Sequence, residues 1–309
     1  MDGIYLVFDY FKEAFHINKR NKRLYTPQLI LIAIKLLMII AVGLRIYTWI
    51  GNFDVSTFSD YRKLLHFFLA YGIKIILALI LYSLVSVFMD SGLYNMYKKC
   101  VLYDSVQEGD FSEGVKKYFL RFLLGSIVIG ILYTVASVII AIIGLITLGL
   151  GSSIILLLAT IFLSMWKVSI VFDDTDVFTA ISNSFKFAKD NFLAISFLQI
   201  VHLAFTNMRS GGSGFNYNSF NSLGNNSNNS LNSTNPFPYQ SKGILDSTQV
   251  IDQGIKLAKT VVAILIPVIT IAALSAYIIK MIFEVFFSLT LFVAYKNKFN
   301  AYNPNREVL

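Results

Sequence analysis

The stretch from residue 118 to residue 172 constrains this chain most, because it is almost unbroken apolar sequence. One membrane crossing needs about 20 apolar residues, so the stretch is long enough for two crossings. Gly144, Gly149 and Gly151 fall near its middle and predict a tight turn. We therefore expect two membrane-spanning helices here, near 119–143 and 150–171.

Four more apolar segments fit the same reading, at 28–50, 64–89, 192–206 and 257–295. The segment 192–206 is short for a span, so a re-entrant or interfacial helix is an alternative. The last segment exceeds one bilayer thickness and contains Pro267, which predicts a kinked or tilted helix. The prediction is an all-α polytopic integral membrane protein, with about six transmembrane helices in a single membrane domain over residues 1–309.

Three other segments have distinct roles in this prediction. Residues 3–17 and 174–190 are amphipathic at helical spacing, and we expect both to lie in the plane of the membrane surface as interfacial helices. Residues 209–243 are rich in Asn, Ser and Gly and have little apolar surface to bury, which predicts a disordered loop.

The net charge of +8 indicates orientation rather than a nucleic-acid partner, because Lys and Arg flank the apolar runs. With the N-terminus inside, the inner joints hold fifteen Lys and Arg residues and the outer joints five. This bias predicts cytoplasmic N- and C-termini. The expected partners are the lipid bilayer and other membrane proteins, and not nucleic acid.

No catalytic or cofactor motif is present, and the three His residues have no partner at ligand spacing. Asp173, Asp174 and Asp176 suit either a hard cation or the N-terminus of a helix, and capping is the simpler interpretation. We therefore expect no catalytic residue, no cofactor and no metal site, and a protein that is not an enzyme.

Charged residues inside spans are the sharpest functional signal, because each is costly in a bilayer unless it is paired or solvated. Lys74, Lys280 and Glu284 lie furthest from the ends of their predicted spans. We expect Glu284 to face the bundle interior and to bond either Lys280, one helical turn away, or Lys74. Structural pairing and a role in transport both explain such charges.

Two stretches resemble a superfamily of bacterial polytopic membrane domains of mostly unknown function, which includes the membrane domain of some glycerophosphoryl diester phosphodiesterases. The matching residues are Gly92, Leu93, Met96, Gly109, Phe111, Gly114 and Tyr118 in the first stretch, and Ala180, Ser184, Phe185, Lys189, Asn191 and Phe192 in the second. The resemblance implies six helices with amphipathic connectors in a bacterial cytoplasmic membrane. It carries over no catalytic residue.

These features lead to a ranked set of functions. The first is a non-enzymatic scaffold or accessory component of an envelope or transport system. The alternative is a small-solute transporter or channel, and a lipid-directed enzyme comes last. A transporter should contain a polar cavity lined by intramembrane charges, whereas a scaffold should have a dry, packed core.

Overall fold

The computed structural model describes residues 2–51, 61–147, 150–207 and 247–302. Within these ranges the chain forms helices and no strands, which confirms the predicted all-α class. The α-helices are α1 (Asp2–Arg20), α2 (Tyr25–Gly51), α4 (Tyr61–Tyr103), α5 (Asp110–Ile146), α6 (Leu150–Phe162), α7 (Trp166–Phe172), α8 (Val177–Asp190), α9 (Phe192–Asn207) and α10 (Ser247–Tyr302), and a short 3-10 helix, η1 (Lys22–Leu24), precedes α2.

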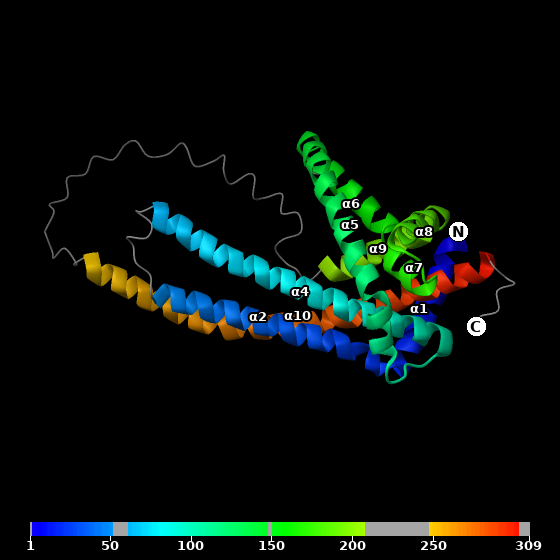
Figure 1. Cartoon of the computed structure of the whole chain (residues 1–309), viewed down its shortest axis with the longest axis horizontal. Helices are drawn as coiled ribbons and strands as arrows, with labels where there is room; N and C mark the ends of the chain where they lie inside the picture. Colours follow the sequence, from blue (N-terminus) through cyan, green and yellow to red (C-terminus); the bar gives the residue numbers. More distant parts are fainter. Residues whose placement is uncertain (1, 52–60, 148–149, 208–246, 303–309) are drawn as a thin grey trace, which may run out of the picture. The chain divides into compact units, whose positions relative to one another are not determined.

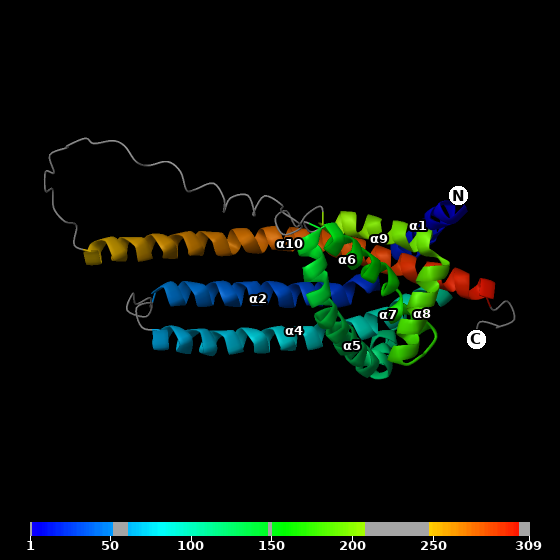
Figure 2. The ribbon, with the colours of Figure 1, turned by 90° about the horizontal axis from the view of Figure 1, so that it is seen from above.

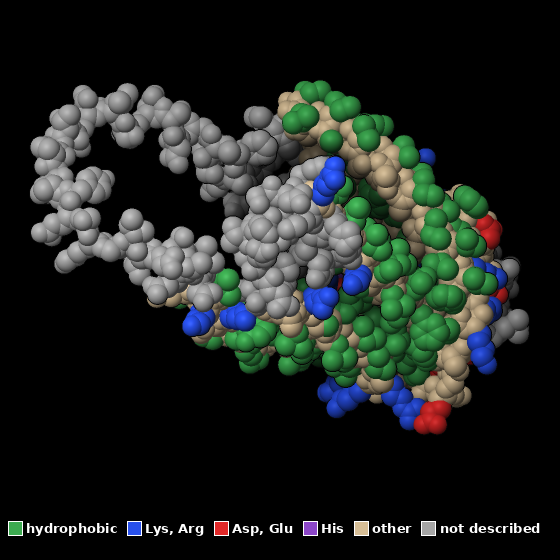
Figure 3. Space-filling model, turned by 60° about the vertical axis from the view of Figure 1, so that its left-hand side comes forward, with side chains coloured by type: hydrophobic (Ala, Val, Ile, Leu, Met, Phe, Trp, Pro, Cys, Tyr) green, Lys and Arg blue, Asp and Glu red, His purple; other side chains and the backbone are tan. Residues whose placement is uncertain are grey.

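Five stretches of the described helices are long and apolar enough to cross a membrane: Lys22–Thr48, Gly72–Tyr103, Asp110–Ile146, Gly151–Phe172 and Gln253–Asn297. A sixth apolar stretch, Phe192–Ala204, is shorter. On the face shown in Figure 3, hydrophobic side chains cover most of the described surface. The protein is therefore a multi-pass membrane protein, and its five long spans agree with those expected from the sequence.

The chain divides into two compact units. The smaller unit comprises the described residues of Leu36–Phe67 and Thr206–Ala276. Within it, α2 and α10 approach closely at Gly43, where an added Cβ would lie 2.8 Å from Ile266 Cγ1. The predicted loop at 209–243 lies outside the described residues.

The larger unit comprises the described residues of Met1–Lys35, Phe68–Phe205 and Tyr277–Leu309, and it holds every candidate site below. In it, α5 and α6 run side by side as an antiparallel hairpin (Figures 1 and 2). The α4 helix continues past Asp90 to Tyr103, and so extends beyond the predicted span 64–89 into the polar segment that connects it to the next span.

Glycines allow α4 and α5 to cross at close range. A Cβ on Gly114 would lie 2.4 Å from Asn95 Cβ and 2.8 Å from the Ser91 carbonyl oxygen, so no larger residue fits. Gly92 packs in the same way against the ring of Phe111. Gly109 precedes α5 with a φ of 101°, a conformation that favours glycine. Close packing and backbone conformation thus give a physical reason for the three glycines in the first of the two stretches that carry the resemblance.

The fourth predicted span is interrupted, because α6 ends at Phe162 and α7 begins at Trp166. Ser184 of α8 bridges the break. Its hydroxyl donates to the Phe162 carbonyl oxygen at 2.6 Å and accepts from the Met165 amide at 3.1 Å. Ser184 is fully buried, so it replaces backbone hydrogen bonds that a continuous helix would have made.

The two amphipathic segments are both helical. In α1, Val7, Tyr10 and Ala14 are buried, whereas Phe8 and Phe15 remain exposed. In α8, the buried face is formed by Val177, Ala180, Ser184 and Ala188. Each helix thus packs one narrow face on the larger unit and leaves apolar side chains outside it, which is compatible with a position at a membrane surface.

Candidate functional site: a charged cavity in the larger unit

A cavity of about 520 Å³ lies in the larger unit. Among the described residues, five Lys, Asp, His or Glu side chains line it, each from a different helix: Lys35 of α2, Asp90 of α4, Lys167 of α7, His202 of α9 and Glu284 of α10. Its volume falls in the range of small-molecule sites, roughly 300–1,000 Å³. Since charged groups are costly within a membrane protein unless they are paired or solvated, this convergence marks the candidate functional site.

Asp90 and Lys167 form the best-defined ion pair in the cavity. The Lys167 Nζ donates to Asp90 Oδ2 at 2.6 Å, and their side chains are 25% and 21% exposed. The same ammonium lies 5.5–5.8 Å from the ring centroids of Tyr94, Phe122 and Trp166. Such cation–π contacts stabilise an ammonium and hold it in place. This pair joins α4 to α7 and neutralises itself.

Lys35 is positioned by aromatic rings. Its Nζ lies 5.3 Å from the centroid of Tyr277 and 5.8 Å from that of Tyr82. Among the described residues, no ion pair joins Lys35 to a carboxylate. Within the described part of the chain, this half-buried ammonium in the cavity wall is therefore held by aromatic rings and not by an acid.

Of the three charges singled out from the sequence, the structure brings Lys280 and Glu284 together. Their ion pair spans one turn of α10 at 3.4 Å, with side chains 48% and 36% exposed. Lys74 is exposed on α4, outside the described lining of the cavity. The sixteen residues from Lys74 to Asp90 correspond to about 24 Å of helix. Glu284 thus faces the cavity while Lys74 lies well away along α4.

The helix break also faces the cavity. Leu163 and Ser164 lie in the break and line the cavity, together with Thr160 and Trp166 at the adjoining helix ends. Irregular backbone at membrane depth is tolerated where it is buried in protein or lines a water-filled cavity. The interrupted span and the charged cavity are therefore one feature of the fold.

The acidic trio of Asp173, Asp174 and Asp176 lies at the corner between α7 and α8. Asp176 caps α8, because its carboxylate accepts from the Phe178 and Thr179 amides at 2.9 and 3.1 Å. Asp173 accepts from Ser169 Oγ at 2.9 Å and from the hydroxyl of Tyr295. The predicted N-capping is confirmed for Asp176 alone among the three. Within the described residues no cluster of three or more His, Cys, Asp or Glu could hold a metal ion.

Asp174 joins the α7–α8 corner to α5 and has a perturbed acidity. Its carboxylate pairs with Lys117 Nζ at 2.9 Å and with Arg121 Nη1 at 2.7 Å. Burial acts to raise the pKa of Asp174, but the hydrogen bonds from Lys117 and Arg121 outweigh it and lower the pKa. Lys98 Nζ also bonds to α7, donating to the Val171 carbonyl oxygen at 2.8 Å. These bonds fix the helix that carries Lys167.

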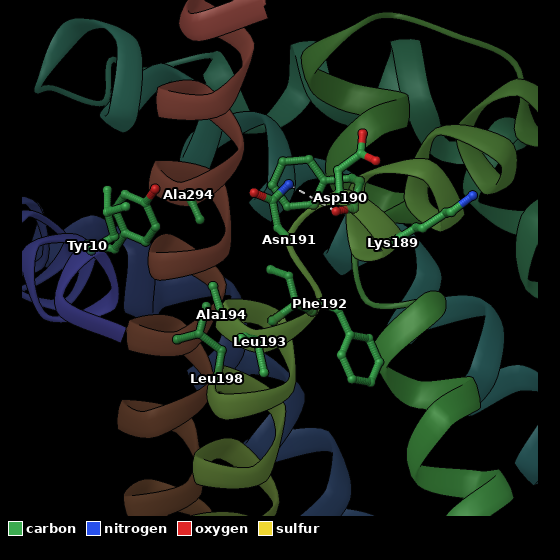
Figure 4. Close-up of a pocket in the computed structure, with 12 residues that line it drawn as sticks. Tyr10, Lys189, Asp190, Asn191, Phe192, Leu193, Ala194, Leu198 and Ala294 are labelled. Carbon is green, nitrogen blue, oxygen red and sulfur yellow. Dashed lines mark hydrogen bonds between the residues drawn. The ribbon is translucent and has the colours of Figure 1, made fainter. Parts of the chain in front are cut away.

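A second pocket of about 350 Å³ lies at the corner between α8 and α9 (Figure 4). Asn191 ends α8 there, and its side-chain amide donates to the Phe187 carbonyl oxygen at 3.0 Å. Much of the lining is apolar, including Leu193, Ala194 and Leu198, while the side chain of Lys189 points away from them (Figure 4). The charged residues in its described lining are Lys189 and Asp190, which are adjacent in the sequence at the end of α8.

Sequence reasoning found Glu284 but missed Asp90 and Lys167. Asp90 comes directly after the predicted span 64–89, and Lys167 lies near the end of the predicted span 150–171. The signal was weak, because a lone charge near a span end is ordinarily solvated at the interface. Their pairing joins positions 77 residues apart, which only the packing of α4 against α7 reveals.

No family model, curated protein or solved structure matches this chain. The resemblance described from the sequence therefore stays a prediction.

Proposed function

We propose that this chain is a non-enzymatic membrane transport protein that holds a small polar solute in the charged cavity. The observation that carries the proposal is the convergence of Lys35, Asp90, Lys167 and Glu284 on one space of about 520 Å³. A purely scaffolding protein has no need for such a space, because packed apolar helices hold together without it.

The interrupted span supports the same proposal. Solute sites in transporters are commonly built from discontinuous membrane helices, whose free backbone groups and charged side chains face the binding space. Here the α6–α7 break contributes Ser164 to the lining, and Lys167 follows within one turn of α7. Both a flexible joint and a charged group are thus present in one wall.

We further propose a bacterial cytoplasmic membrane, with the N- and C-termini in the cytoplasm. The bias of Lys and Arg toward the joints on that side supports this orientation. It requires α9, with 16 residues and about 24 Å in length, to complete the sixth crossing. Lipids and other membrane proteins are the partners expected in this setting.

Cysteine accessibility tests the proposal. In a Cys100→Ser background, Ser288→Cys places a thiol in the cavity lining, whereas Thr290→Cys places one at a fully buried position on the same helix. A membrane-impermeant thiol reagent should modify Ser288→Cys at least tenfold faster than Thr290→Cys in native membranes. Equal, slow modification of both, with fast modification after denaturation, would show that water does not reach the cavity and would overturn the proposal.

A scaffolding role is the second candidate, and the exposed side chains of the interfacial helices favour it. Phe8 and Phe15 of α1 are 57% and 58% exposed, and Phe178 of α8 is 72% exposed. Replacing the three with Ser should release a bound membrane partner in a mild-detergent pull-down if they dock protein. If the amount of recovered partner is unchanged, these side chains contact lipid and do not dock protein.

A further inference from the structure

We propose that the solute is a zwitterion, with its anionic group on Lys35 and its cationic group on Glu284. This inference rests on the proposed transport function and specifies the substrate class of the same cavity. Its basis is the distribution of charge along the lining, taken side chain by side chain.

Apart from His202, the lining holds one ion pair, Asp90 with Lys167, and two further charges, Lys35 and Glu284, for which no ion pair to each other is found among the described residues. Asp90 and Lys167 bond at 2.6 Å, and three aromatic rings surround the ammonium, so this pair has little left to offer a solute. Lys35 is held by Tyr82 and Tyr277 and forms no ion pair among the described residues. An anionic group of a solute would supply the missing partner of Lys35.

Glu284 has a cationic partner in this structure, Lys280, but their ion pair is weak enough for a solute ammonium to displace it. Its partner Lys280 lies 3.4 Å away, is 48% exposed and stands outside the described lining. Exposed ion pairs of this kind contribute little free energy, so a solute ammonium can replace Lys280 at small cost.

Charge balance decides between the solute classes. A simple anion that reached Lys35 would share the cavity with the carboxylate of Glu284, and a simple cation would share it with Lys35. Each single charge would therefore gain one partner and meet one repulsion within the same confined space. A molecule that carries both charges gains both partners. This chemistry occurs in free amino acids and in the headgroup of phosphatidylethanolamine.

Binding of matched probes tests the inference. Purified protein in phosphatidylglycerol nanodiscs is titrated with 3-aminopropanoate, 4-aminobutanoate and 6-aminohexanoate, and then with butylamine and butanoate, by calorimetry. At least one of the three zwitterions should bind tenfold or more tightly than either singly charged compound. Lys35→Met and Glu284→Gln should each weaken that binding at least tenfold. Lys99→Met and Glu108→Gln, which lie outside the cavity, should leave it unchanged.

Two comparisons separate the possible outcomes. If phosphatidylethanolamine nanodiscs abolish the probe binding measured in phosphatidylglycerol nanodiscs, the zwitterion is a lipid headgroup; if the probe binds equally in both lipids, it is a free solute. Equal binding of butylamine or butanoate, or unchanged binding in both cavity variants, would overturn the zwitterion, as would the absence of binding by every zwitterion. The transport proposal is tested separately, and it fails if Ser288→Cys is modified as slowly as Thr290→Cys.

Discussion

Removing the Lys167 ammonium should destabilise the larger unit more than removing a lysine from one of the ion pairs at the unit's surface. In Lys167→Met the Asp90 carboxylate, with its side chain 21% exposed, loses a 2.6 Å partner. Breaking a buried pair from one side costs about 3–5 kcal/mol, and partial exposure of both groups places this case near 2–3 kcal/mol. Asp90→Asn should cost less, because three aromatic rings still stabilise the Lys167 ammonium.

The chain carries its own reporter for this measurement. Cys100 is the only cysteine and is fully buried, so a fluorogenic maleimide reacts with it only when the larger unit opens. Denaturant titrations in mild detergent, followed by Cys100 labelling, give the free energy of unfolding for each variant. The control is Lys99→Met, which removes a 3.5 Å pair with Glu113 whose side chains are 29% and 54% exposed. It should cost less than about 1 kcal/mol.

The double variant Asp90→Asn/Lys167→Met completes a thermodynamic cycle. The sum of the stability losses in the two single variants should exceed the stability loss in the double variant by about 2 kcal/mol, because the two groups interact directly. Additive losses, or equal costs for Lys167→Met and Lys99→Met, would refute the claim that this pair holds α4 to α7.

Four further predictions rest on other parts of the structure. Gly114→Ala should destabilise the protein by about 1–3 kcal/mol, since its Cβ would overlap Asn95, while Gly130→Ala, with open space around it, should be nearly neutral in the same thermal unfolding assay. Ser184→Ala should cost about 1–3 kcal/mol by leaving the groups at the α6–α7 break unpaired, and Ser112→Ala, on an exposed hydrogen bond, should not. The pKa of Asp174 is lowered in the folded state, so the stability that its ion pairs contribute is present above its unfolded pKa of about 3.9 and is lost as pH falls through the folded pKa. The variant Asp174→Asn should be less stable than wild type by less than about 1 kcal/mol. This difference should stay constant from neutral pH to about 5 and shrink under more acid conditions. A periplasm-active reporter fused at Asn225 should be active and one fused at Lys189 inactive, and the reverse pattern would overturn the proposed orientation.

The helical framework could be predicted from the sequence because a bilayer imposes a length and a composition on every span. The turn near Gly144–Gly151 and the cap at Asp176 were predictable for local reasons, since each depends on residues close in the chain. The break at 163–165 was not. It contains neither Pro nor Gly, and the group that stabilises it, Ser184, lies on another helix.

The cavity could be predicted only in part, for the same physical reason. Glu284 stood out because it lies deep in an apolar segment, and its bond to Lys280 follows from helical spacing. Asp90, Lys167 and Lys35 come from three other helices, and their convergence depends on how those helices pack. Hydropathy reports depth in the membrane but carries no information on which helix faces which.

The measurement that tests the central claim most directly is the sidedness of access to the cavity. Vesicles of defined orientation carrying Ser288→Cys in the Cys100→Ser background are treated with an impermeant thiol reagent from one face at a time. A transport protein exposes its site alternately to the two sides, so the account predicts modification from both faces, with Thr290→Cys protected from both. Modification from one face alone would contradict transport and would mark the cavity as a closed-ended binding site.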